Sequence, residues 1–275
     1  MISTKLSNPI LKSQNIALST LGAIALTVFT GSLSIVSTAN AQYGLGLPRS
    51  AGTGGATRGN LPQITMLVPE DGAKTLAARP TFYWYIAPTT TAATAIPPSV
   101  DGKNSFKITF FLRDGNGRSA KSVFIAEGVA DKAGLYKFTL PENAPALSTG
   151  KVQRWQIRWQ TNGGASQVDV NAPIRRDEDP AISKLIATAK NDLEKARIYT
   201  KSAYWYDAID AYTSWLAQNP QDQAAKSERS NLLKEGFKNH TAFSKSQEAN
   251  ITKLLSKLDE SQSATSIVLQ TKSRL

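Results

Sequence analysis

A run of seven residues, RWQIRWQ, alternates strictly between polar and large apolar side chains from Arg154 onward. In an extended strand Trp155, Ile157 and Trp159 share one face, whereas a helix of 3.6 residues per turn would scatter them. The pattern therefore predicts a half-buried β-strand, with Arg154 and Arg158 on its outward face.

The same period of two recurs in six further segments between residues 61 and 176. Turn-forming runs separate them, such as PEDG at 69–72 and DGNG at 114–117, and these are typical of tight connections between strands. Seven short strands with turns between them predict an antiparallel, immunoglobulin-like β-sandwich over residues 61–176. The expected strands begin near Ile64, Thr81, Phe106, Ser122, Tyr136, Arg154 and Val168.

The apolar spacing changes to three and four residues after Pro180, which predicts a helical tail and an α+β protein. The first helix is expected to start at Pro180, behind three acidic residues that suit a helix N-terminus, and to continue through Tyr199. A second helix is expected over residues 203–218, and a third follows it. These helices make a subdomain over residues 177–240, and residues 241–275 are expected to add a helix whose C-terminal end frays.

Part of this tail has the spacing of one tetratricopeptide repeat, which is a helical hairpin. Such repeats need about three copies to be stable alone, and a second copy starting near Gln223 does not match. We therefore expect one hairpin packed on the β-domain and no peptide-binding solenoid. The matching residues are Ala196, Tyr199, Ala208, Tyr212 and Pro220.

The N-terminus has the features of a cleavable signal peptide, predicted over residues 1–41. Two lysines precede an apolar stretch over residues 16–36, and small residues then lead to Ala-Asn-Ala at 39–41. The apolar stretch is long enough for an uncleaved anchor, but the Ala-x-Ala pattern favours cleavage. Residues 42–60, rich in Gly, Ser, Thr and Arg, predict a flexible linker. We expect an exported protein of the periplasm or outer cell surface, with no membrane span after cleavage.

Residue content limits the chemistry of the mature chain. The 275 residues include no cysteine, which excludes disulfides, thiolate metal sites and a cysteine nucleophile. His240 is the only histidine, so a catalytic triad or a multi-histidine zinc site would depend on it. No glycine-rich nucleotide signature occurs at a strand–helix junction, and we expect no cofactor. The formal charge of +11 favours anionic partners, although it also fits ordinary surface charge.

A hydrolase is a weaker alternative. Glycosidases need only two carboxylates, and the sequence contains several acidic residues that could form such a pair. The acidic run at 177–179 offers oxygen ligands for calcium, but it lacks a ligand loop and suits a helix start better. The remaining acids also fit turn, helix-surface or capping positions. The candidates for a catalytic pair are Glu70, Asp71, Asp114, Glu127 and Asp207.

Two tyrosines and four arginines are candidates for binding a partner. If Phe82 and Trp84 point into the core, Tyr83 and Tyr85 point outward. There they would stack on sugar rings, fill a protein interface, or be covered by the helical tail. A basic strip for an acidic ligand is expected from Arg154, Arg158, Arg175 and Arg176.

Several short motifs occur in a characteristic order: RPTF at 79–82, FLRD at 111–114, LP at 140–141 and, most specifically, YWYDA at 204–208. Together they resemble the exported cyanobacterial proteins grouped as domain-of-unknown-function family 928, over roughly residues 62–237. The resemblance implies an envelope location in a photosynthetic bacterium. It implies no catalytic residues, because the family has no established activity.

The sequence therefore favours a non-enzymatic module of the cell envelope, structural or interacting, whose partner is an envelope protein or an anionic envelope polymer. The alternative is a domain that binds carbohydrate or cell-wall polymer, and the third is the carboxylate-dependent hydrolase. Nucleic acid is not expected as a partner, because export separates the protein from it and the motifs of nucleic-acid readers are missing.

Overall fold

The computed structural model describes residues 42–48, 64–87, 106–117, 119–161, 167–238, 247–260 and 264–272. The expected signal peptide, residues 49–60 of the expected linker and His240 lie outside the described residues.

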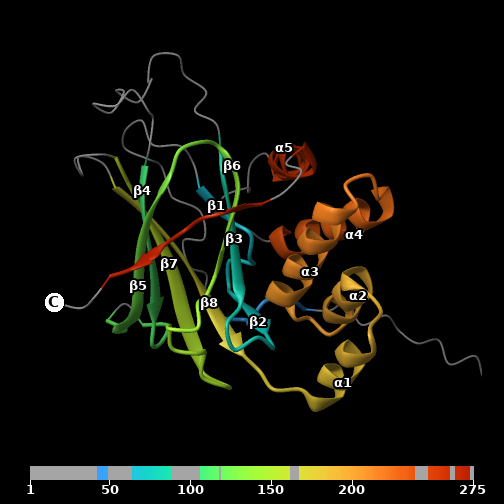
Figure 1. Cartoon of the computed structure of the whole chain (residues 1–275), viewed down its shortest axis with the longest axis horizontal. Coiled ribbons are helices and arrows are strands. Elements are labelled where there is room, and N and C mark those ends of the chain that lie inside the picture. Colours follow the sequence, from blue (N-terminus) through green and yellow to red (C-terminus); the bar gives the residue numbers. More distant parts are fainter. Residues whose placement is uncertain are drawn as a thin grey trace, which may run out of the picture. The chain divides into compact units, whose positions relative to one another are not determined.

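In the described part of the chain, ten strands form two sheets (Figure 1). The four-stranded sheet contains, in spatial order, β1 (Ile64–Met66), β3 (Thr81–Ile86), β6 (Gly134–Thr139) and β9 (Thr265–Ser266). The six-stranded sheet contains, in spatial order, β10 (Gln270–Thr271), β5 (Ser122–Ala130), β4 (Phe106–Arg113), β7 (Val152–Thr161), β8 (Gln167–Arg176) and β2 (Ala73–Thr75).

Each of the seven segments with the period-two pattern contains a strand, namely β1, β3, β4, β5, β6, β7 and β8. The structure adds β2, β9 and β10, so the expected number of seven is too low. β9 and β10 have only two residues each, too few for a periodic pattern to show, and β2 is Ala-Lys-Thr, which has no large apolar side chain.

Aromatic side chains from the two sheets meet in a common core. The ring of Phe82 on β3 lies 4.7 Å from that of Trp155 on β7, and Phe110 on β4 lies 4.8 Å from Phe138 on β6. Trp155, Ile157 and Trp159 are all fully buried, as the alternation predicts. The inward positions of β4 and β7 are thus defined, and the intervening residues face outward.

Among the described residues, five helices follow the strands up to β8 and precede the last two strands. The single helix expected after Pro180 is divided in two, because Asn191 starts a new helix: its side chain accepts from the Glu194 N–H at 2.9 Å, and the Glu194 carboxylate accepts from the Lys190 N–H at 2.7 Å. The helices are α1 (Pro180–Thr188), α2 (Asp192–Lys201), α3 (Trp205–Gln218), α4 (Gln223–Phe237) and α5 (Gln247–Glu260).

The helix α3 joins the helices to the β-sheets, and Figure 1 shows it beside β2 and β3. Trp205, at its first turn, is fully buried, and its indole N–H donates to the Leu67 carbonyl at 2.8 Å. Gly236, in the last turn of α4, lies against this indole, and a Cβ there would overlap the ring. Glycine is disfavoured within helices, but here it is required because the Trp205 indole approaches the backbone of α4 too closely for a side chain.

Both ends of the described chain are held against the sheets. Residues 42–48, expected to belong to a flexible linker, contact the domain: the Tyr43 ring lies 5.4 Å from that of Trp205, Gly44 bridges to Ala73, and the Gly46 N–H donates to Asp71 at 2.8 Å. Single side-chain and backbone contacts thus hold this segment against the domain.

The C-terminal residues also differ from expectation. Where the chain was expected to fray after a helix, β9 pairs with β6 and β10 pairs with β5, so this segment extends both sheets. The physical reason is that a sheet edge presents unpaired backbone groups, and even a polar segment satisfies them.

Candidate binding surface

Tyr83 and Tyr85 are both buried, with 3% and 6% of their surfaces exposed, and Tyr83 lies against α3. The Tyr83 hydroxyl donates to the Asp210 carboxylate on α3 at 2.6 Å. Burial raises the pKa of Tyr83, and the nearby Asp210 charge raises it further, so the phenol remains a donor at any physiological pH. Of the three environments considered for these tyrosines, cover by the helical tail is observed for Tyr83, and the burial of both leaves neither placed to stack on a sugar ring.

Arg175 and Arg176 lie at the junction between β8 and α1. The guanidinium of Arg175 forms two hydrogen bonds to Asp177, at 2.7 and 3.0 Å. Arg176 donates to the Leu147 carbonyl at 3.2 Å and lies 3.6 Å from Glu178. These contacts tie the end of the sheet to the first helix. Arg175 still shares the outward face of the six-stranded sheet with Arg154 and Arg158, because register pairs it with Val152, whereas Arg176 lies on the other side of β8.

The outward faces of β4 and β7, the two central strands of the six-stranded sheet, carry four cations and no acid. In the described part of the chain the helices contact β2, β3 and β6, and Figure 1 shows none over this face. We call this surface the basic face. Its residues are Lys107, Thr109, Phe111, Arg113, Arg154, Gln156, Arg158 and Gln160.

Strand register places Arg113 directly opposite Arg154. Arg113 donates to the side-chain oxygen of Gln156 and to the Ala120 carbonyl, both at 3.1 Å. Arg154 donates to the side-chain oxygen of Asn116 at 3.3 and 3.2 Å. The two guanidinium groups thus lie on neighbouring strands, each donating to a side-chain oxygen.

The other two cations of the basic face, Arg158 and Lys107, each form an ion pair with an acid of a neighbouring strand. Arg158 binds both oxygens of Asp169 on β8, at 2.9 and 3.0 Å, and hydrogen bonding to this carboxylate raises the pKa of the guanidinium. The guanidinium also lies over the Phe111 ring, 5.2 Å from its centre, and that of Arg113 lies 5.6 Å from the same ring. Lys107 lies 3.1 Å from Glu127 on β5.

Of the six predicted site residues, the structure brings Arg154, Arg158 and Arg175 onto the outward face of the six-stranded sheet. Lys107, Phe111 and Arg113 join them there, and the sequence analysis did not select them. The alternation that begins with Phe106-Lys107-Ile108 along β4 indicates that Lys107, Phe111 and Arg113 face outward. Their position beside β7 depends on strand pairing, which no local pattern contains.

The acids considered for a hydrolase are separately engaged. Asp71 accepts from a backbone N–H of the N-terminal segment at 2.8 Å, Asp114 lies 2.7 Å from Lys151, which precedes β7, and Glu127 lies 3.1 Å from the lysine of β4. Asp207 accepts from a backbone N–H after β2 at 3.0 Å, and Glu70 is buried. Two of them differ from the positions expected: Glu127 lies within strand β5 and not in a turn, and Asp207 bonds to the loop after β2 and does not cap a helix.

The acidic run before α1 also serves the fold. Asp179 caps α1 by accepting from the Ile182 N–H at 3.0 Å, and it accepts from the Tyr204 hydroxyl at 3.2 Å. Glu178 accepts from the Thr149 hydroxyl at 2.8 Å. Among the described residues no group of three or more acids or histidines is arranged to hold a metal ion.

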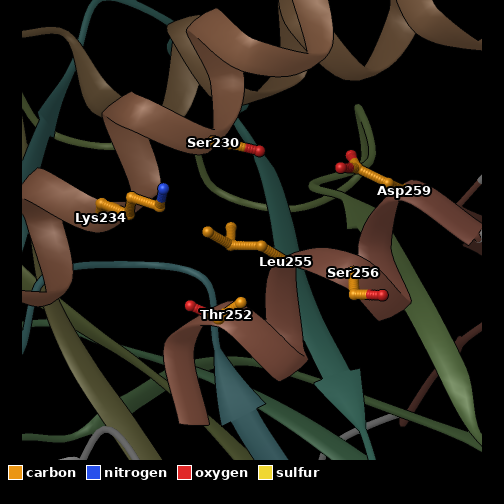
Figure 2. A pocket seen from close by; sticks show the side chains of 6 residues that line it. All are labelled: Ser230, Lys234, Thr252, Leu255, Ser256 and Asp259. Atoms are coloured by element: carbon orange, nitrogen blue, oxygen red, sulfur yellow. The ribbon is translucent and has the colours of Figure 1, made fainter. Parts of the chain in front are cut away.

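A groove of about 490 Å³ lies between α4 and α5. Ser230 and Lys234 line it from α4, and Leu255 and Asp259 line it from α5 (Figure 2). The Asp259 carboxylate is held by Arg229 at 2.7 Å. The groove therefore offers the ammonium group of Lys234 and the hydroxyls of Ser230, Thr252 and Ser256, while the Asp259 carboxylate is already paired with Arg229.

The chain is thus a mixed α+β protein with two sheets, helices over one of them and a basic face on the other. Residues 50–246, well over half of the chain, match the family model of the Domain of Unknown Function (DUF928), and the chain belongs to this family. No curated protein matches the chain. In the described part of the chain, no helix has the length and apolar character needed to cross a membrane.

Proposed function

We propose that this chain is a non-enzymatic interaction module of the cell envelope and that it holds its partner on the basic face. The observation that carries the proposal is the difference between the two sheets. The outer face of β3 is buried under α3, whereas the outward positions of β4 and β7 hold four cations away from the described helices.

Export supports the same function. The apolar stretch and the Ala-x-Ala pattern at residues 39–41 favour secretion into the periplasm or to the outer surface, and the family resemblance implies an envelope location. An envelope is rich in anionic polymers and lipids, to which a chain with a formal charge of +11 is attracted.

The distribution of strands supports an immunoglobulin-like sandwich as the scaffold of this module. The first, second and fifth of the seven predicted strands pair as β1-β3-β6, and the other four pair as β5-β4-β7-β8. Crossing of the chain between two such sheets is typical of this class. Contact between α2 and α3, with Ala196, Ala208 and Tyr212 buried, supports one hairpin of the tetratricopeptide type.

The proposal is tested by co-sedimentation of purified residues 42–275 with isolated envelope at low and high salt. Retention is expected at low salt and should fall at high salt, because exposed charges are screened. Lys107→Gln with Arg158→Gln should weaken retention. The matched control, Lys184→Gln with Lys201→Gln, removes the same charge from exposed helix positions and should not. Absence of retention, or equal loss in both variants, would refute the proposal.

A further inference from the structure

The groove between α4 and α5 is lined mainly by polar side chains from both helices. Ser230 and Lys234 are one turn apart on α4, so they lie on the same side of that helix. The lining residues of α5 are likewise spaced by three and four positions. Packed helices usually meet through apolar side chains, whereas these two stripes leave a groove of about 490 Å³. On α5 the lining residues are Thr252, Leu255, Ser256 and Asp259 (Figure 2).

The charges along this groove leave one cation without an acid. The Asp259 carboxylate lies 2.7 Å from the guanidinium of Arg229, which is buried with 6% of its surface exposed. This pair is neutral as a whole, and the Nε of Arg229 has no hydrogen-bond partner within the described chain. Lys234 is exposed and forms no ion pair or hydrogen bond with a described residue. Its ammonium group is therefore available to an anion.

The size of the groove and its hydroxyl groups define the kind of anion. Small-molecule sites have volumes of roughly 300–1,000 Å³, so this groove has room for an organic molecule and is larger than an inorganic ion needs. The side chains of Ser230 and Thr252 form no hydrogen bond with a described residue, and each hydroxyl both donates and accepts. Leu255 adds an apolar contact. These groups match a ligand with one carboxylate, several hydroxyls and C–H surface.

We propose that the groove between α4 and α5 binds a small hydroxylated carboxylate of the sugar-acid class. The carboxylate pairs with Lys234 and accepts from Ser230, a ligand hydroxyl bonds to Thr252, and the C–H surface lies against Leu255. A phosphate monoester carries nearly two charges and matches a single lysine less well. This site goes beyond the proposed function, because none of its residues belongs to the basic face.

The test is a titration of purified, isotope-labelled residues 42–275 with D-glucuronate, followed by NMR. D-glucose, which lacks the carboxylate, and hexanoate, which lacks the hydroxyls, are the control ligands. Glucuronate is expected to bind about tenfold or more tightly than either, with the largest shift changes at the residues that line the groove. Absence of glucuronate binding, or equal affinity for a control ligand, would overturn the inference.

Substitutions locate the site. Lys234→Gln should weaken glucuronate binding about tenfold or more, because a charge-assisted contact is lost. Lys184→Gln removes the same charge from an exposed position on α1 and should leave the affinity within about twofold. Thr252→Val, also at an exposed position, keeps the side-chain shape without the hydroxyl and should weaken binding about threefold or more. Equal weakening by the two lysine substitutions would overturn the inference, since net charge alone would then explain binding.

The variant with Lys107→Gln and Arg158→Gln distinguishes this site from the proposed function. It should weaken envelope retention and leave the affinity for glucuronate within about twofold, because the two surfaces share no residue. Loss of glucuronate binding in this variant would place the ligand on the basic face and overturn the inference. Unchanged envelope retention would count against the proposed function alone.

Discussion

At the scale of single residues, Asp207 ties a helix to a loop of the sheet. It lies in the first turn of α3, and its carboxylate accepts from the Leu76 N–H at 3.0 Å. Burial raises its pKa to about 6, against the opposing effect of the hydrogen bonds that it accepts, with Leu76 first among the donors. The motif YWYDA thus places a titratable group at the junction of the helices and the β-sheets.

Asp207→Asn is expected to change how stability depends on pH. The pKa of Asp207 is higher in the folded state than in the unfolded chain. Its contribution to the free energy of unfolding is therefore fully present below about pH 4 and is lost as pH rises through about 6. The asparagine keeps an acceptor for the Leu76 N–H and does not titrate. Urea unfolding measures the free energy of unfolding of both proteins. The value for the variant minus that for wild type should rise by on the order of 2 kcal/mol between pH 4 and pH 7. Parallel pH profiles would contradict the assignment.

At the scale of elements, α3 is the joint between the helices and the sheets. Three of its residues reach different parts of the β-domain: Trp205 donates to the carbonyl of Leu67, Tyr206 accepts from the indole of Trp155 at 2.8 Å, and Asp210 accepts from Tyr83. The helices and sheets therefore share buried hydrogen bonds as well as a common apolar core.

Trp205→Ala is expected to destabilise the protein by about 3–5 kcal/mol, because a fully buried indole and its hydrogen bond are both removed. Trp205→Phe serves as the control. It keeps most of the ring and loses the donor to Leu67, so its cost should be about 1–3 kcal/mol. Thermal and urea unfolding measure both. An unchanged melting temperature in the alanine variant would show that Trp205 is not part of the joint.

At the scale of the whole molecule, the C-terminal segment covers the edges of both sheets. Besides the pairing of β9 and β10, the Lys272 N–H donates to the Ile125 carbonyl at 3.0 Å, and Ile267 is buried. Gly128 permits the close approach, because a Cβ there would fall 2.6 Å from the Leu269 side chain. The family match ends at residue 246, so these edges are covered by residues that follow it.

Removal of residues 264–275 is expected to lower the melting temperature by roughly 5 °C or more and to promote self-association, because two strand edges are uncovered. Removal of residues 273–275 alone leaves both strand pairs intact and should have little effect. Differential scanning calorimetry and light scattering measure the two effects. A monomer as stable as wild type after the longer truncation would show that the segment does not protect the edges.

Local periodicity determined much of the fold. The face of β7 that is buried, the existence of seven of the strands and the inward side of α3 all follow from side chains a few residues apart, since a backbone of fixed period sorts them by face. The division at Asn191 was also present in the sequence, as an Asn-x-x-Glu capping pattern. That signal was local and was missed.

Only the tertiary structure decided which faces remain open. Tyr83 and Arg158 both point outward from their strands, yet one is covered by α3 and the other lies on the basic face. The pairing of Arg113 with Arg154, and the use of residues 264–272 as edge strands, likewise join segments far apart in the chain. Such contacts depend on strand register and on the docking of whole elements, which no pattern within a single segment specifies.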